Sequence, residues 1–237
     1  MHIKRLAANR HIRLPKKVKK FVISIMPGKH PKDEAIPLGY VVRDILGHAL
    51  TYKEARKAVG KRYYYIDGRL AKDIKTPLGV MDVLEIIATG ETYRVVYNDD
   101  GILDLIKISK KDASKKIGSI RYKRLVKGGK IMLTTHDGRN FVLPYEEGNK
   151  YKVGDSILFE IPSQKIIKRL ELKPDALVMV ISGKWAGKIG KVKNIEIIRG
   201  LEPNKITIVC ENGTEITTLK DYVMVLGENK SEVKIRE

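Results

Sequence analysis

The chain has 237 residues, and its 47 Lys or Arg against 28 Asp or Glu give a formal net charge of +19. Hydrophobic residues make up 43% of the sequence, which argues against general disorder. A single cysteine excludes an intramolecular disulfide framework and any Cys-rich metal site. No apolar run approaches the ~20 residues of a membrane span. We therefore expect a soluble, intracellular protein whose partner is a polyanion, of which nucleic acid is the commonest.

The first 32 residues carry ten basic residues and no acidic residue. Such a run repels itself, so the sequence predicts a segment that does not collapse on itself. One interpretation is a solvated tail. The other is an arm, residues 1–36, that becomes ordered on a phosphate backbone and releases counterions. The apolar run 21–26 is expected to anchor this arm to the body of the protein.

Two short helices are predicted after the arm. Pro37 suits the first turn of a helix, and apolar residues then recur at helical spacing over 38–46. Thr51 and Glu54 form a capping-box pattern at the start of a second helix, and Gly60 is a plausible stop. These elements open a predicted module over 37–87.

The second helix has a basic face. Lys53, Arg56 and Lys57 are three and four residues apart, which places them on one side. A strand at 63–66 follows, and Asp67-Gly68 is typical of a tight hairpin turn. An ordinary solvated helix beside a hairpin would give the same pattern. These cations are therefore candidates for contact with a polyanion.

The middle of the chain, residues 88–172, alternates apolar and polar residues. Strands are predicted at 92–97, 102–108, 130–135, 141–143, 156–161 and 165–172, with turns at 98–101 and 136–139. Several short strands at this spacing indicate a small sheet or barrel, a central β domain.

Glycine and lysine alternate near the carboxyl end. Val178, Val180 and Val192 fit a buried strand face, while three glycines allow tight turns or close backbone approach: Gly183, Gly187 and Gly190. Further strands are predicted at 195–198, 205–210, 215–219 and 222–226. Trp185 lies between lysines in this loop, where it could stack on a base, insert into a neighbouring protein or fill a core. The spacing fails the P-loop pattern because the glycine gap is one residue short.

Three segments of the sequence resemble known families. Thr51, the Ala55-Arg56 pair and the turn at 66–68 resemble the S-four RNA-binding domain. The glycine–lysine spacing of 178–192 resembles the KOW motif of SH3-like barrels in ribosomal and transcription-elongation proteins. The order of these parts, with segments 2–8, 65–69 and 76–83, resembles the small-subunit ribosomal protein family S-four-e of archaeal and eukaryotic type.

The resemblance implies an α+β, mostly β fold: a basic N-terminal arm (1–36), a small S-four-like helix–helix–hairpin module (37–87), a central β domain (88–172), a C-terminal KOW SH3-like barrel (173–226) and a tail (227–237). It also implies a non-enzymatic protein of the cytoplasmic ribosome that binds ribosomal RNA, contacts neighbouring ribosomal proteins and supports subunit assembly. The predicted RNA-binding residues are Lys4, Arg5, Arg10, Arg13, Lys16, Lys17, Lys19, Lys20, Lys53, Arg56, Lys57, Lys61, Arg62, Lys72, Lys184, Trp185, Lys188 and Lys191.

Two alternatives stay open at this point. One is a KOW-type transcription-elongation factor, and the other is an RNA-modifying factor, because S-four modules often accompany such enzymes. The sequence contains no recognisable catalytic motif, so we expect no catalytic residues, no metal and no cofactor. A membrane partner is not expected.

Overall fold

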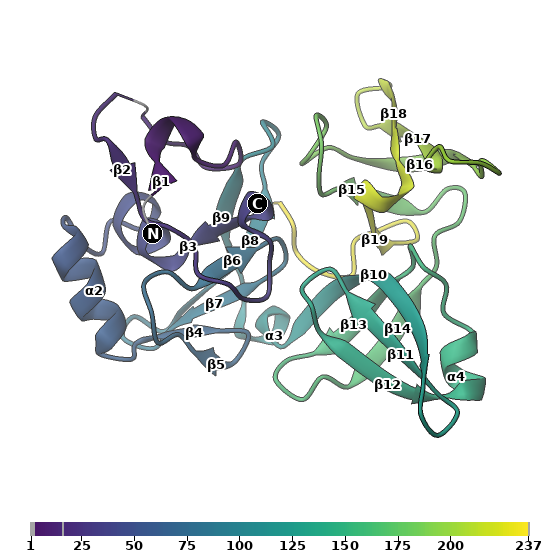
Figure 1. The fold of residues 1–237 in the computed structure, drawn as a ribbon, viewed down its shortest axis with the longest axis horizontal. Coiled ribbons are helices and arrows are strands. Elements are labelled where there is room, and N and C mark those ends of the chain that lie inside the picture. The colour runs from purple at the N-terminus through teal and green to yellow at the C-terminus, as the bar shows by residue number, and fades with distance from the viewer. Residues whose placement is uncertain (1–2, 16, 237) are drawn as a thin grey trace. The chain divides into compact units, whose positions relative to one another are not determined.

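A computed structural model describes residues 3–15 and 17–236 (Figure 1). The fold is α+β and mostly β, as predicted. The chain divides into two compact units, and each is described by itself. Unit 1 comprises residues 1–98, 102–113 and 236–237, and unit 2 comprises residues 99–101 and 114–235. Among the described residues, no helix has both the length and the apolar character that a membrane crossing requires.

Unit 1 is built on a five-stranded antiparallel sheet in the order β5-β4-β7-β8-β9. Its strands are β4 (Tyr64–Ile66), β5 (Arg69–Leu70), β7 (Val83–Ile86), β8 (Glu91–Tyr97) and β9 (Leu103–Lys107). The predicted turn between β4 and β5 is confirmed, since Asp67 and Gly68 both have positive φ, as a two-residue hairpin requires. A second, two-stranded pairing joins β3 (Ala35–Pro37) to β6 (Pro77–Gly79).

The helices of unit 1 are short. They are α1 (Leu38–Tyr40), which continues as a π-helical turn over Val41–Ile45, α2 (Tyr52–Gly60) and α3 (Lys110–Ala113). Pro37 lies in extended backbone just before α1 and not in its first turn. The capping box of α2 is confirmed: the Glu54 amide donates to Thr51 Oγ1, and the Glu54 carboxylate accepts from the Thr51 amide.

The basic segment folds back on itself, so the expectation that charge repulsion would prevent this is wrong. β1 (Ile3–Lys4) pairs antiparallel with β2 (Phe21–Val22), and the Arg5 amide donates to the Lys20 carbonyl at 3.0 Å. Backbone groups make this pairing while most of the cations remain in water, where the high dielectric weakens their repulsion.

The segment is also attached to the rest of unit 1. The Tyr40 hydroxyl donates to the Arg13 carbonyl at 2.8 Å, and the Leu103 amide donates to the His11 carbonyl at 2.9 Å. Ile25, within the predicted apolar anchor, is buried. The arm is therefore an ordered part of unit 1.

Unit 2 contains two five-stranded antiparallel sheets. The first has the order β12-β11-β10-β13-β14, and its strands are β10 (Lys115–Val126), β11 (Lys130–Thr135), β12 (Asn140–Pro144), β13 (Ser156–Glu160) and β14 (Ile166–Leu170). A short helix, α4 (Tyr145–Asn149), follows β12. The long strand β10 was not predicted, although the strands around it were.

The second sheet has the order β18-β17-β16-β15-β19. Its strands are β15 (Leu177–Val180), β16 (Ile189–Glu196), β17 (Lys205–Cys210), β18 (Glu215–Leu219) and β19 (Val223–Gly227). Val178, Val180 and Val192 are buried, as predicted. The two sheets are joined by a buried hydrogen bond in which the Val225 amide donates to the Ser156 hydroxyl at 2.9 Å.

The two compact units are coarser than the five predicted parts of the chain, whose boundaries stay a prediction. The boundary at residue 88 runs between β7 and β8, which are paired neighbours in one sheet, so unit 1 continues to Ala113. Residues 228–236 contact the rest of unit 2: the Glu232 amide donates to the Leu226 carbonyl, and Val233 is buried.

Candidate nucleic-acid interface

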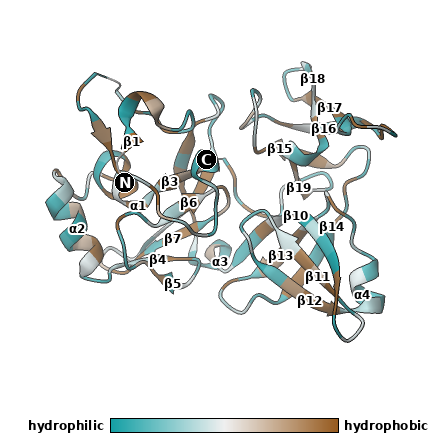
Figure 2. Cartoon of the chain, in the orientation of Figure 1, coloured by the Kyte–Doolittle hydropathy of each residue, from teal (hydrophilic) through white to brown (hydrophobic). Residues whose placement is uncertain are grey.

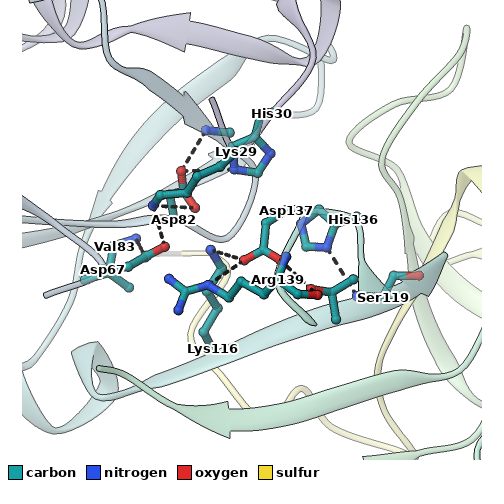
Figure 3. Close-up of polar contacts among 12 residues, drawn as sticks. Lys29, His30, Asp67, Asp82, Val83, Lys116, Ser119, His136, Asp137 and Arg139 are labelled. Carbon is teal, nitrogen blue, oxygen red and sulfur yellow. Dashed lines mark hydrogen bonds and ion pairs between the residues drawn. The ribbon is translucent and has the colours of Figure 1, made fainter. Parts of the chain in front are cut away.

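A buried ionic network connects the end of the basic arm to the hairpin region of unit 1 (Figure 3). Lys29 Nζ lies 2.8 Å from Asp67 Oδ2, and His30 Nε2 lies 3.1 Å from Asp82 Oδ2. Both carboxylates are fully buried, and they also accept hydrogen bonds from the amides of Val83 and Gly79. Buried carboxylates need such partners, so this network fixes the arm to β7 and the β4–β5 turn.

Most of the predicted RNA-binding residues of the arm are exposed. Six cations point to solvent: Lys4, Arg10, Arg13, Lys17, Lys19 and Lys20. Arg5 does not, because its side chain is 6% exposed and its guanidinium donates to the Pro15 carbonyl at 2.6 Å. Lys16 lies outside the described residues. The ordered arm thus presents a dense basic surface with one buried arginine beneath it.

Helix α2 adds a second basic surface to unit 1. Ala55 and Val59 are buried on its inner side, and most of its other residues are hydrophilic (Figure 2). The predicted cations on and after the helix are all exposed: Lys53, Arg56, Lys57, Lys61, Arg62 and Lys72. Backbone hydrogen bonds from Leu50 and Thr51 lower the pKa of Glu54, so its carboxylate holds the cap in place. The capped helix fixes the spacing of Lys53, Arg56 and Lys57 along its backbone. Contacts of this kind to phosphates would position a polyanion without reading its sequence.

The glycine-rich loop of unit 2 has the predicted local geometry. Gly183 and Gly187 have positive φ, and a side chain at Gly190 would collide with the Val209 carbonyl oxygen. Trp185 is half-buried, neither a core residue nor fully free, and Lys184 Nζ lies 4.9 Å from the centroid of its ring. Lys184 and Lys191 are exposed, and Lys188 is half-buried. The loop therefore places one lysine over the Trp185 ring, and the exposed Lys191 follows on β16.

Sequence reasoning did not anticipate the buried ion pairs of unit 2. Lys116 Nζ and Arg139 Nε lie 2.9 Å and 3.0 Å from Asp137 Oδ2 (Figure 3). Burial is the largest influence and favours the protonated form of this carboxyl group. The charges of Lys116 and His136, together with hydrogen bonds from Thr135 and Lys116, outweigh it and hold the pKa of Asp137 far below its ordinary value. The guanidinium of Arg139 also stacks 5.5 Å from the Phe159 ring centroid. These cations stabilise the sheet and are not part of the exposed surface.

A strongly basic, β-rich protein with ordered clusters of exposed cations is typical of the nucleic-acid-binding class. Comparison with known proteins narrows this class. A model of the ribosomal family S4e matches residues 89–166. The small ribosomal subunit proteins eS4 of Methanocaldococcus jannaschii and Archaeoglobus fulgidus are 37% and 39% identical to the chain. They align with 99% and 98% of it and with 97% and 95% of their own lengths.

A solved structure gives the same result for the fold. The crystal structure of the 30S ribosomal protein S4e from Thermoplasma acidophilum matches with a TM-score of 0.70 and 32% identity, over 83% of this chain and 97% of that one. The chain belongs to the ribosomal family S4e. The family resemblance stated from the sequence is thereby confirmed.

Proposed function

We propose that this chain is a structural, non-enzymatic constituent of the small ribosomal subunit in the cytoplasm, where it binds ribosomal RNA and supports subunit assembly and translation. Its partners are small-subunit ribosomal RNA and neighbouring ribosomal proteins, as the names of its relatives imply. The observation that carries the proposal is the fixed spacing of exposed cations on the ordered arm and on α2. Such cations neutralise phosphates without reading base sequence.

In this proposal the arm, the S-four-like module and the KOW barrel have separate roles. The S-four-like module (37–87) fixes the docking position with the basic face of α2. The KOW SH3-like barrel (173–226) widens the footprint through Lys184, Lys188, Lys191 and Trp185. The arm cations run along the RNA backbone, and the buried Arg5 supports them from below. RNA suits this arrangement better than DNA because irregular RNA folds are recognised by shape and backbone.

Sedimentation of cell extract tests the proposal. The extract is run on a sucrose gradient before and after a high-salt wash, and the protein is followed by immunoblot. Retention with small subunits through the wash is expected. Release to the top fractions, or migration with RNA polymerase, would instead place the protein among transient RNA-binding or transcription factors.

A further inference from the structure

Unit 1 contains a cavity of about 440 Å³ between the arm and the helices. This volume lies within the range of about 300–1,000 Å³ of small-ligand sites. Its lining comes from five separate stretches of the chain: the start of the arm, residues 19–24, the helical turn after α1, the start of α2, and the loop before β6. Arg5 and Lys19 of this lining were predicted as RNA-binding residues from the sequence, but the cavity that they share with the other segments was not.

The chemistry of the lining is basic and aromatic. Four cations contribute, namely Arg5, Lys19, Arg43 and Lys75, and no carboxylate belongs to the lining among the described residues. Arg43 donates hydrogen bonds of 3.0 Å and 2.6 Å to Asp44, which does not belong to the lining. Three cations therefore remain without a carboxylate partner among the described residues, a charge balance that favours an anionic ligand.

Arg5 is the feature that points most directly to a ligand. Its side chain is 6% exposed and lines the cavity, and one of its terminal nitrogens is bonded to the Pro15 carbonyl. Its Nε is buried and has no hydrogen-bond partner among the described residues. A buried donor left without an acceptor costs free energy, and a phosphate oxygen in the cavity would satisfy it.

Two aromatic rings stand at the same cavity. Phe21 is 47% exposed and Tyr52 is 41% exposed, although large aromatic side chains are usually buried more completely. Lys20 Nζ lies 5.5 Å from the centroid of the Phe21 ring and keeps positive charge beside it. Exposed rings next to cations are the arrangement with which proteins hold unpaired bases, by stacking on the ring and pairing with the phosphate.

We infer that this cavity binds one unpaired nucleotide of the RNA, with its phosphate at Arg5, Lys19 and Lys75 and its base against Tyr52 or Phe21. An acidic peptide of a neighbouring protein would use the cations but gains less from the two exposed rings. This inference rests on the proposed function, since the nucleotide belongs to the bound ribosomal RNA. The nucleotide site adds base recognition to an interface whose cations otherwise contact the RNA phosphates.

Filter binding of the full-length chain to a small-subunit ribosomal RNA transcript provides the first test. Alanine at the ring that holds the base, in Tyr52→Ala or in Phe21→Ala, is expected to weaken binding at least about fivefold, from the loss of one stacked base. Tyr52→Phe keeps the ring and should bind like the wild type. Tyr63→Ala is the matched control, because Tyr63 is 40% exposed in the same unit but does not line the cavity. Thermal unfolding of each variant checks that the fold is retained.

Ultraviolet crosslinking of the same complex, followed by digestion and mass spectrometry, provides the second test. Nucleotide adducts are expected on peptides that contain Phe21 or Tyr52. If the wild type binds the transcript, yet the alanine variants bind equally well and no adduct forms at either ring, the nucleotide site is overturned while the proposed function stands. If the wild type itself fails to bind the transcript, the proposed function fails, and the nucleotide site fails with it. If these peptides instead crosslink to a neighbouring protein in assembled subunits, the ligand of the cavity is a peptide and the nucleotide site is overturned.

Discussion

Lys116 Nζ lies 2.9 Å from Asp137 Oδ2, and both side chains are completely buried in unit 2. The pair joins strand β10 to the turn between β11 and β12, where a hydrogen bond from the Thr135 hydroxyl and an ion pair with Arg139 complete the coordination of the carboxylate. Removing two charges from water is expensive, so this arrangement is stable only while every partner is present.

Loss of the lysine should therefore destabilise unit 2. Lys116→Met leaves a buried carboxylate with one cation fewer, and we expect a decrease of about 3–5 kcal/mol in the free energy of unfolding. Urea unfolding measures this decrease. The signal is the fluorescence of Trp185, which is the only tryptophan of the sequence and belongs to unit 2. The control is Lys130→Met, at an exposed position on β11, with an expected change within about 0.5 kcal/mol. Equal stability of the two variants would show that the buried pair contributes nothing.

The same carboxylate should give unit 2 an acid-dependent stability. Because the pKa of Asp137 is lower in the folded chain than in the unfolded one, its contribution is fully present above about pH 4, the ordinary range of the unfolded carboxyl group. It is lost as the pH falls further, toward the folded pKa. In Asp137→Asn this contribution is absent at every pH. The difference in unfolding free energy between wild type and variant should thus narrow from pH 7 to pH 3. A constant difference between pH 7 and pH 3 would contradict a lowered pKa of Asp137 in the folded chain.

The glycine-rich loop offers a test of close backbone approach. A Cβ atom at Gly190 would lie 2.4 Å from the Val209 carbonyl oxygen, so Gly190→Ala must push β16 away from β17. We expect a loss of about 1–3 kcal/mol in unfolding free energy, again from Trp185 fluorescence in urea. Gly200→Ala is the matched control, since nothing lies within 4 Å of the added atom and its φ is not positive. The prediction fails if both variants unfold at the same urea concentration.

Local patterns were sufficient to predict much of the fold. Strands 130–135, 205–210 and 215–219 have the predicted limits, because each alternates or concentrates apolar residues between clear turns. The capping box and the Asp67-Gly68 turn are equally local, so a few adjacent residues determine them.

Features that depend on distant partners could not be predicted in this way. Strand β10 was missed because fully buried Lys116 interrupts its apolar pattern, and only Asp137 makes that burial tolerable. The arm is held in place by hydrogen bonds to its backbone carbonyl groups, such as that of Arg13. A hydropathy pattern contains no information about these bonds. The cavity beside Tyr52 is formed by segments up to 70 residues apart, so no sequence window contains it.

The basic face of α2 allows the proposed RNA contacts to be counted. Arg56 and Lys57 are exposed on a helix whose inner side is already packed, so Arg56→Gln combined with Lys57→Gln should leave the fold intact. If each cation neutralises one phosphate, binding to a small-subunit ribosomal RNA transcript should weaken, and the slope of log affinity against log salt should become shallower by about one per contact. Lys230→Gln, at an exposed cation of unit 2 outside the predicted set, is the control and should leave the slope unchanged. Filter binding between about 50 and 300 mM salt measures the affinity and the slope of each variant. Phosphate contacts change affinity strongly over roughly this range. An unchanged slope in the double variant would remove α2 from the interface and leave the arm as its main basic surface.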